Sequence, residues 1–127
     1  MENLKIAATE RSPAVDFDFS AGRLSLKGES YPEDASAVFG PIFSSLEAFF
    51  AEASGREVAF DFDLTYFNSS SAKALMNMFQ MLDRAAGQGC RVAVNWHFAA
   101  DDDTMREFGE DFSEDLGNVA FNLVALE

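Results

Sequence analysis

The stretch Asp61-Phe-Asp-Leu-Thr-Tyr-Phe-Asn-Ser-Ser-Ser-Ala-Lys-Ala-Leu-Met-Asn-Met-Phe-Gln80 changes its hydrophobic period halfway along. Upstream of Asn68, every second residue from Phe60 to Leu64 is large and apolar, which is typical of a strand with one buried face. Downstream, apolar residues recur every three or four positions, as on an amphipathic helix: Ala72, Leu75, Met76, Phe79 and Leu82. The serines between these segments predict a strand-to-helix junction, with Ser69 or Ser70 as the N-cap.

A serine at the start of a helix has two interpretations. In the structural one, its hydroxyl accepts a hydrogen bond from an amide of the first turn, which stabilises the helix by about 1 kcal/mol. In the functional one, the serine is phosphorylated. The helix N-terminus carries about half a positive charge and free amides, so it tolerates a phosphate of about −1.5 to −2 charge. Such a modification changes the surface and leaves the fold intact.

The composition predicts one cytoplasmic domain spanning residues 1–127. This length is sufficient for a substantial core, and 48% of the residues are hydrophobic. The single cysteine, Cys90, has no partner for an internal disulfide, so nothing indicates an oxidising compartment. The N-terminus lacks the order of a signal peptide, and no apolar run reaches the ~18 residues of a membrane span.

The charge is strongly acidic and uneven. Nine basic and 22 acidic residues give a net charge of −13, which repels nucleic acids and anionic lipid, so we expect neither nucleic-acid nor membrane binding. From Asp101 to the end, nine acidic residues accompany one basic residue, Arg106. This segment is either a solvated, solubilising surface or a docking face for a basic partner.

The remaining periodicities predict alternating strands and helices. We expect strands at residues 4–7, 15–19, 23–27, 57–66, 92–97 and 120–126, and helices at 35–50, 70–86 and 104–115. Two capping boxes are predicted ahead of the first and third helices, Ser30 with Glu33 and Thr104 with Glu107. Pro41 predicts either a kink in the first helix or a second helix starting there.

This order predicts an α/β fold with a mixed sheet, because strands that alternate with helices pair in parallel. A sheet covered on both faces has nearly continuous apolar strands, whereas these strands alternate. We therefore expect the helices on one face and a solvated face lined by Asp61, Asp63, Asn95 and His97.

The sequence offers little for catalysis. His97 is the only histidine and has no nucleophile beside it in sequence, and Cys90 is better explained as a structural thiol. No dinucleotide or Walker motif is present, and Asp101-Asp-Asp103 lacks the ligand spacing of a calcium loop. We expect no catalytic residue, no cofactor, no dedicated metal site and no enzymatic activity.

The predicted second helix carries two further stripes. One is polar and comprises Ser70, Lys73, Asn77, Gln80 and Arg84. The other is an apolar flank beside the core-facing residues and comprises Ala74, Met78, Met81 and Ala85. The flank is either part of a wide buried face or, since methionine suits adaptable contacts, a partner surface next to the serines.

Four segments resemble the SiaC-type regulatory phosphoproteins over almost the whole chain: Gly22-Arg-Leu-Ser-Leu26, Gly28-Glu-Ser-Tyr-Pro-Glu33, Tyr66-Phe-Asn-Ser-Ser-Ser-Ala-Lys-Ala-Leu-Met76 and Val94-Asn-Trp-His97. The Ser-Tyr-Pro-Glu and Asn-Ser-Ser-Ser stretches are the most specific. The chain is more distantly similar to the STAS domains of anti-sigma-factor antagonists, whose modified serine also begins a helix after a strand.

The resemblance implies a STAS-like switch protein. A cognate serine/threonine kinase phosphorylates such proteins, a PP2C-type phosphatase reverses the modification, and the unphosphorylated form binds and activates a diguanylate cyclase, which raises cyclic di-GMP and favours biofilm growth. Carried over by position, the acceptor is Ser69, with Ser70 as a competitor. We expect the partner to contact the start and flank of the second helix: Asn68, Ser70, Ser71, Lys73, Asn77, Met78 and Met81. The alternative is an antagonist in a sigma-factor or stressosome-like switch.

Overall fold

The fold alternates strands and helices in the predicted order. A computed structural model describes residues 2–126 of the chain. The strands are β1 (Leu4–Ile6), β2 (Ala14–Asp18), β3 (Arg23–Ser30), β4 (Glu57–Phe67), β5 (Arg91–Ala99) and β6 (Ala120–Leu126), and the helices are α1 (Ala35–Phe50), α2 (Ser69–Gly87) and α3 (Asp103–Glu114). Within these residues, no helix combines the length and apolar character that crossing a membrane requires.

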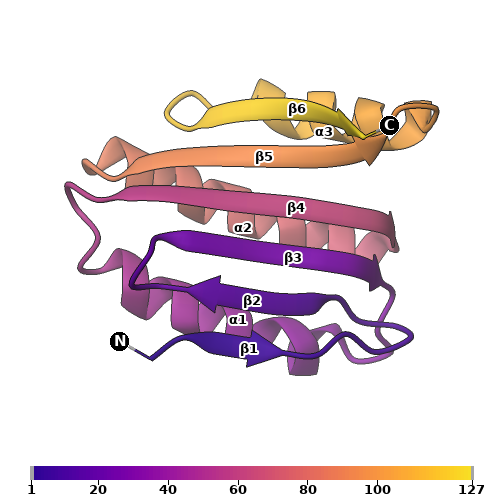
Figure 1. Cartoon of the computed structure of the whole chain (residues 1–127), viewed down its shortest axis with the longest axis horizontal. Helices are drawn as coiled ribbons and strands as arrows, with labels where there is room; N and C mark the ends of the chain where they lie inside the picture. The colour runs from indigo at the N-terminus through magenta and orange to yellow at the C-terminus, as the bar shows by residue number, and fades with distance from the viewer. Residues whose placement is uncertain (1, 127) are drawn as a thin grey trace.

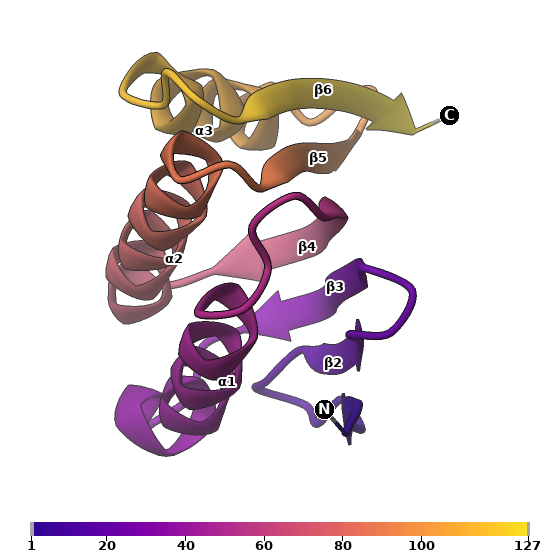
Figure 2. The same cartoon turned by 90° about the vertical axis from the view of Figure 1, so that its left-hand side faces the viewer.

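The six strands form one mixed sheet in chain order, from β1 to β6 (Figure 1). The pairs β1–β2 and β2–β3 are antiparallel, whereas β3–β4, β4–β5 and β5–β6 are parallel. Parallel strands are joined by crossovers of one hand, so a sheet that grows in one direction receives every connecting helix on the same face. All three helices of the described chain lie on one side of the sheet (Figure 2), which confirms the predicted α/β architecture.

The two faces of the sheet differ in burial as the alternation predicted. Phe60 and Phe62 of β4 point into the core and are fully buried, whereas the intervening Asp61 lies on the open face. There, a ladder of side-chain hydrogen bonds crosses three strands: Asn122 Nδ2 donates to Asn95 Oδ1 at 3.0 Å, and Asn95 Nδ2 donates to Asp61 Oδ1 at 3.0 Å. The open face is therefore polar and solvated.

The N-cap residue of each of the three helices differs from the one that the sequence predicted. The N-caps are Asp34, Asn68 and Asp102, spaced 34 residues apart, and each side chain accepts a hydrogen bond from the amide three residues on. The predicted capping boxes do not form. Ser30 is the last residue of β3, and Thr104 lies inside the first turn of α3. A short Asp or Asn side chain directly before the helix reaches the first-turn amide, so it takes the capping position.

Pro41 neither ends α1 nor starts a second helix, because α1 continues from Ala35 to Phe50. A proline inside a helix leaves the carbonyl four residues earlier without its usual donor. Both Pro41 and Ala37, whose carbonyl is affected, are exposed, so water can hydrate that carbonyl.

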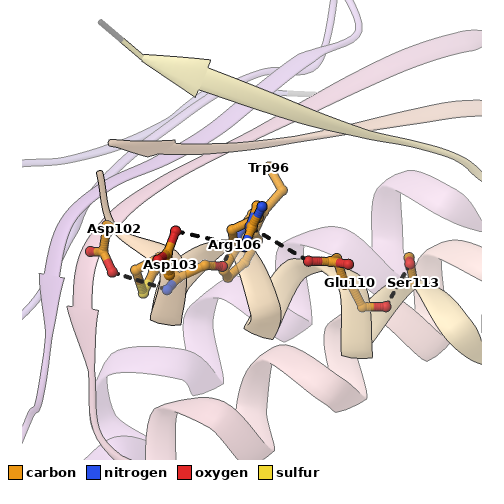
Figure 3. A network of polar contacts seen from close by, with 7 residues as sticks. Trp96, Asp102, Asp103, Arg106, Glu110 and Ser113 are labelled. Carbon is orange, nitrogen blue, oxygen red and sulfur yellow. Dashed lines mark hydrogen bonds and ion pairs between the residues drawn. The ribbon is translucent and has the colours of Figure 1, made fainter. Parts of the chain in front are cut away.

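α3 is held close to the sheet by Trp96 of β5 and by a glycine. The Trp96 Nε1 donates to the backbone carbonyl of Met105 at 2.9 Å, and only 1% of the Trp96 surface is exposed. Figure 3 shows Trp96 reaching this helix from the strand. A Cβ atom at Gly109 would lie 2.5 Å from Trp96 Cδ1 and 2.6 Å from Leu123 Cδ2. A glycine at this position is therefore a packing requirement.

We predict that Gly109→Ala lowers the free energy of unfolding by about 1–3 kcal/mol, because the added methyl overpacks the contact between α3 and the sheet. The matched control is Gly40→Ala, at a helical glycine with no heavy atom within 4 Å of the added carbon. That variant should gain about 0.5–1 kcal/mol from helix propensity. Urea unfolding measures both, and equal effects of the two substitutions would contradict the packing argument.

Candidate functional site

The site is built where β4 passes into α2, and a break in strand register shapes it. Gly28 of β3 pairs with Leu64, but the next residue pairs with Tyr66, so Thr65 is an extra residue in β4. Such a bulge reverses the alternation of side chains that follows it. As a result Tyr66 is 52% exposed and Phe67 is buried.

The serine run begins α2, but Asn68 caps it. Asn68 Oδ1 accepts from the Ser71 amide at 2.9 Å, so the expectation of Ser69 or Ser70 as N-cap is wrong. Ser69 and Ser70 are instead the first two residues of the helix, and both are exposed. Within residues 2–126 neither hydroxyl has a hydrogen-bond partner, so both are accessible to a modifying enzyme.

Ser71, the third serine, is buried and structural. Its hydroxyl lies 2.7 Å from the Ser30 hydroxyl and donates to the Ser30 carbonyl at 2.9 Å. The Asn68 amide donates to that same carbonyl at 3.0 Å. Ser30 and Ser71 are each at most 1% exposed. These bonds tie the end of β3 to the first turn of α2, and they remove Ser71 from the predicted partner contacts.

The side of α2 that faces solvent is not the side that the sequence predicted, because the helix is rotated about its axis relative to that expectation. Met78 is fully buried, and Met81 is half-buried beside Phe50 of α1 in a shallow surface groove. The exposed methionine is Met76, at 49%, although its spacing had placed it with the core residues. α1 packs over the flank that carries Met78, so the prediction that Met78 contacts a partner is wrong. The exposed residues of α2 are Ser69, Ser70, Lys73, Met76, Asn77, Gln80, Arg84 and Gly87.

Exposed apolar side chains gather around the serine run. Tyr66 stacks edge-on against Tyr31 with 5.8 Å between the ring centroids. Phe108 of α3 is 39% exposed and lies 4.8 Å, centroid to centroid, from Phe67, the residue before the cap. Tyr66 and Phe108 are thus two of the six exposed large hydrophobic residues of the described chain, and a third, Met76, lies on α2 seven residues after Ser69. Contiguous exposed apolar residues are typical of interaction surfaces.

The electrostatics of the junction also differ from those of the other two helix starts. α1 and α3 are capped by aspartates, whereas α2 is capped by the neutral Asn68 and has no acidic residue in its first turn. The positive end of α2 is therefore not compensated by its own carboxylates. Charge added at Ser69 or Ser70 would lie where the helix dipole favours a negative group.

The other candidate groups lie elsewhere and show no catalytic arrangement. His97 lies on the open face of the sheet, where its Nε2 is 3.0 Å from Asp61 Oδ1. The same oxygen also accepts a hydrogen bond from Asn95 Nδ2. Cys90 is buried, and this burial raises the pKa of its thiol above the ordinary value, with Arg56 opposing the shift. Among the described residues, no group of three or more His, Cys, Asp or Glu side chains could hold a metal ion.

We predict that Ser71→Ala lowers the free energy of unfolding by about 1–3 kcal/mol, because it leaves the buried Ser30 hydroxyl without a partner. The double variant Ser30→Ala/Ser71→Ala should lose less than the sum of the single variants. A double-mutant cycle by urea unfolding measures this coupling. Strictly additive losses would contradict a direct bond between the two hydroxyls.

Known proteins resemble this chain over nearly its whole length. Residues 6–126 match the sequence model of the SiaC family regulatory phosphoproteins. An uncharacterized protein of Pseudomonas aeruginosa strain UCBPP-PA14, PA14_02130, is 37% identical over 115 residues, which cover 91% of this chain and 90% of that protein. Its sequence therefore aligns with this chain almost end to end.

Two solved structures show the same fold. The SiaC chain in the crystal structure of the P. aeruginosa diguanylate cyclase SiaD with its activator SiaC aligns with a TM-score of 0.88 and 35% identity, covering 97% of this chain and 99% of that one. Apo-SiaC from the same organism aligns with a TM-score of 0.83 and 35% identity over the full length of both chains. The chain belongs to the SiaC family of regulatory phosphoproteins.

Proposed function

We propose that this protein is a non-enzymatic partner switch that controls a diguanylate cyclase. A cognate serine/threonine kinase phosphorylates it at Ser69, and a PP2C-type phosphatase removes the phosphate. The unphosphorylated form binds and activates the cyclase, which raises cyclic di-GMP and favours biofilm growth. The support from similarity is that SiaC of P. aeruginosa, which shares this fold and 35% of its residues, is an activator of the cyclase SiaD.

The observation that carries the proposal is the combination at the start of α2. Two free serine hydroxyls are exposed there, the cap of the helix is neutral, and exposed apolar side chains surround the junction. A surface of this kind suits a protein partner, because its apolar side chains gain free energy when a partner removes them from water. The serines stand at the edge of that surface.

Phosphorylation would act on binding without refolding the protein. A phosphate on Ser69 adds about −1.5 to −2 charge beside the uncompensated end of α2, which tolerates it. A docking partner would have to strip water from that charge, which is unfavourable unless the partner supplies a cation. The unphosphorylated surface lacks this penalty. The switch is therefore electrostatic and steric.

The helical positions favour Ser69 over Ser70 as the control point. Ser69, Lys73 and Met76 lie four and seven residues apart, so they follow one another along the same side of α2. Ser70 belongs to the neighbouring row with Asn77. A phosphate on Ser69 would thus lie on the same side of α2 as the exposed Met76, with Lys73 between them. We revise the contact set to the exposed residues and the half-exposed cap: Asn68, Ser69, Ser70, Lys73, Met76, Asn77 and Gln80.

We predict that Ser69→Ala abolishes phosphorylation by the cognate kinase and keeps cyclase binding. Ser70→Ala should remain a substrate, and it is the matched control because it removes the same hydroxyl one residue along the same helix. Phosphate mapping by tandem mass spectrometry and affinity measurement on both variants test this. Full phosphate incorporation into Ser69→Ala would reject the assignment, and capture of an anti-sigma factor kinase in place of a cyclase would reject the proposed client.

We also predict that Met76→Ala weakens cyclase binding by about tenfold, since truncating a central apolar contact commonly costs more than 1 kcal/mol. Ile6→Ala is the control, because Ile6 is 40% exposed but lies on β1, away from α2. Calorimetric titration of the cyclase with each variant provides the affinities. Equal losses for both substitutions would show that the outward face of α2 is not the contact surface.

A further inference from the structure

We propose that the outer edge of β6 is a docking site for an extended, basic segment of a partner protein, which would add a seventh strand to the sheet. In residues 2–126 no strand pairs with that edge, because β6 is the last strand of the sheet and pairs only with β5. The edge runs the full length of Ala120–Leu126 (Figure 1). This site is separate from the serine junction of α2.

β6 lacks the features by which proteins usually protect an edge strand. Natural edges are short, charged, interrupted by proline or bulged. From Leu116 to Leu126 the chain has no charged residue and no proline, and the pairing of β6 with β5 runs without a register shift. The opposite edge strand, β1, has only three residues, one of which is Lys5. The open edge of β6 is therefore the one suited to strand addition.

The direction of the backbone groups identifies which residues a docked strand would bond. The carbonyl of Leu126 accepts from the Ala100 amide at 2.8 Å, so it points toward β5. Because backbone groups alternate along a strand, those of Phe121, Leu123 and Ala125 point outward. Leu123 and Ala125 are exposed, and α3 lies behind β6, on the helix-covered face of the sheet (Figures 1 and 2).

The charge beside the edge selects a basic occupant. α3 lies next to β6 on the helix-covered face and carries five acidic residues and one basic residue, Arg106. Arg106 is already placed between Asp103, at 3.6 Å, and Glu110, at 3.7 Å (Figure 3). Pairing of two β6 edges would bring two such acidic helices together, which is repulsive. A segment rich in Lys or Arg would instead be attracted by the same charges.

The test titrates the 15N-labelled protein with a synthetic eight-residue peptide of alternating valine and arginine. We expect amide shifts centred on Phe121, Leu123 and Ala125, and a dissociation constant that rises with salt. A second peptide with alternate backbone amides N-methylated has the same charge and side chains, but it cannot complete the ladder. It should bind at least tenfold more weakly to the unchanged protein.

Ala125→Pro removes one outward amide and should also weaken binding of the unmethylated peptide at least tenfold, whereas Ala125→Thr, which keeps that amide, should not. Thermal unfolding of both variants verifies that they are folded. Equal affinity of the methylated and unmethylated peptides would show attraction by charge alone and overturn the proposal. A monomer–dimer equilibrium that Ala125→Pro abolishes would also overturn the proposal, because the edge would then accept a second copy of the chain.

Discussion

Parallel pairing of β3, β4, β5 and β6 in chain order is the constraint from which the rest of this structure follows. Crossovers of one hand, repeated in one direction, place all three helices on the same face. They also place the three helix starts at the same edge, after the carboxyl ends of β3, β4 and β5. One face of the sheet therefore remains open and polar. The carboxyl ends of the parallel strands, where the helices start, are where a surface site can form.

Among these three similar junctions, only the one between β4 and α2 departs from the pattern. The extra residue Thr65 turns Tyr66 outward and Phe67 inward just before the helix. The buried hydroxyls of Ser30 and Ser71 then hold the first turn of α2 against the end of β3. The two exposed hydroxyls of Ser69 and Ser70 therefore stand on a first turn that is hydrogen-bonded to the neighbouring strand.

Charge separates the two surfaces to which we assign partners. At α2, the neutral Asn68 stands where the other two helices have aspartates, so the positive end of this helix dipole can stabilise an added phosphate. At α3, acidic residues already dominate, and the adjacent β6 is free of charge. Under the two proposals, the surface at α2 is switched by added charge, whereas the acidic surface beside β6 attracts basic segments.

The sequence by itself determined the elements, their order and the two faces of the sheet. The two-residue period of Phe60, Phe62 and Leu64 and the helical period after Asn68 arise from local chain geometry and need no knowledge of neighbours. The same holds for the acidic segment after Asp101. The serine run was likewise placed at a strand-to-helix junction by a change of period alone.

Only the tertiary structure decided which side chains face a partner. Apolar residues cover more than half of the α2 circumference, and spacing placed Met76 with the core residues and Met78 on the apolar flank. α1 packs over the flank with Met78 and leaves Met76 exposed, and that choice depends on how neighbouring helices fit. The roles of Asn68 and Ser71 were decided in the same way, because a cap and a buried hydroxyl pair depend on backbone positions and on Ser30, 41 residues away in the chain.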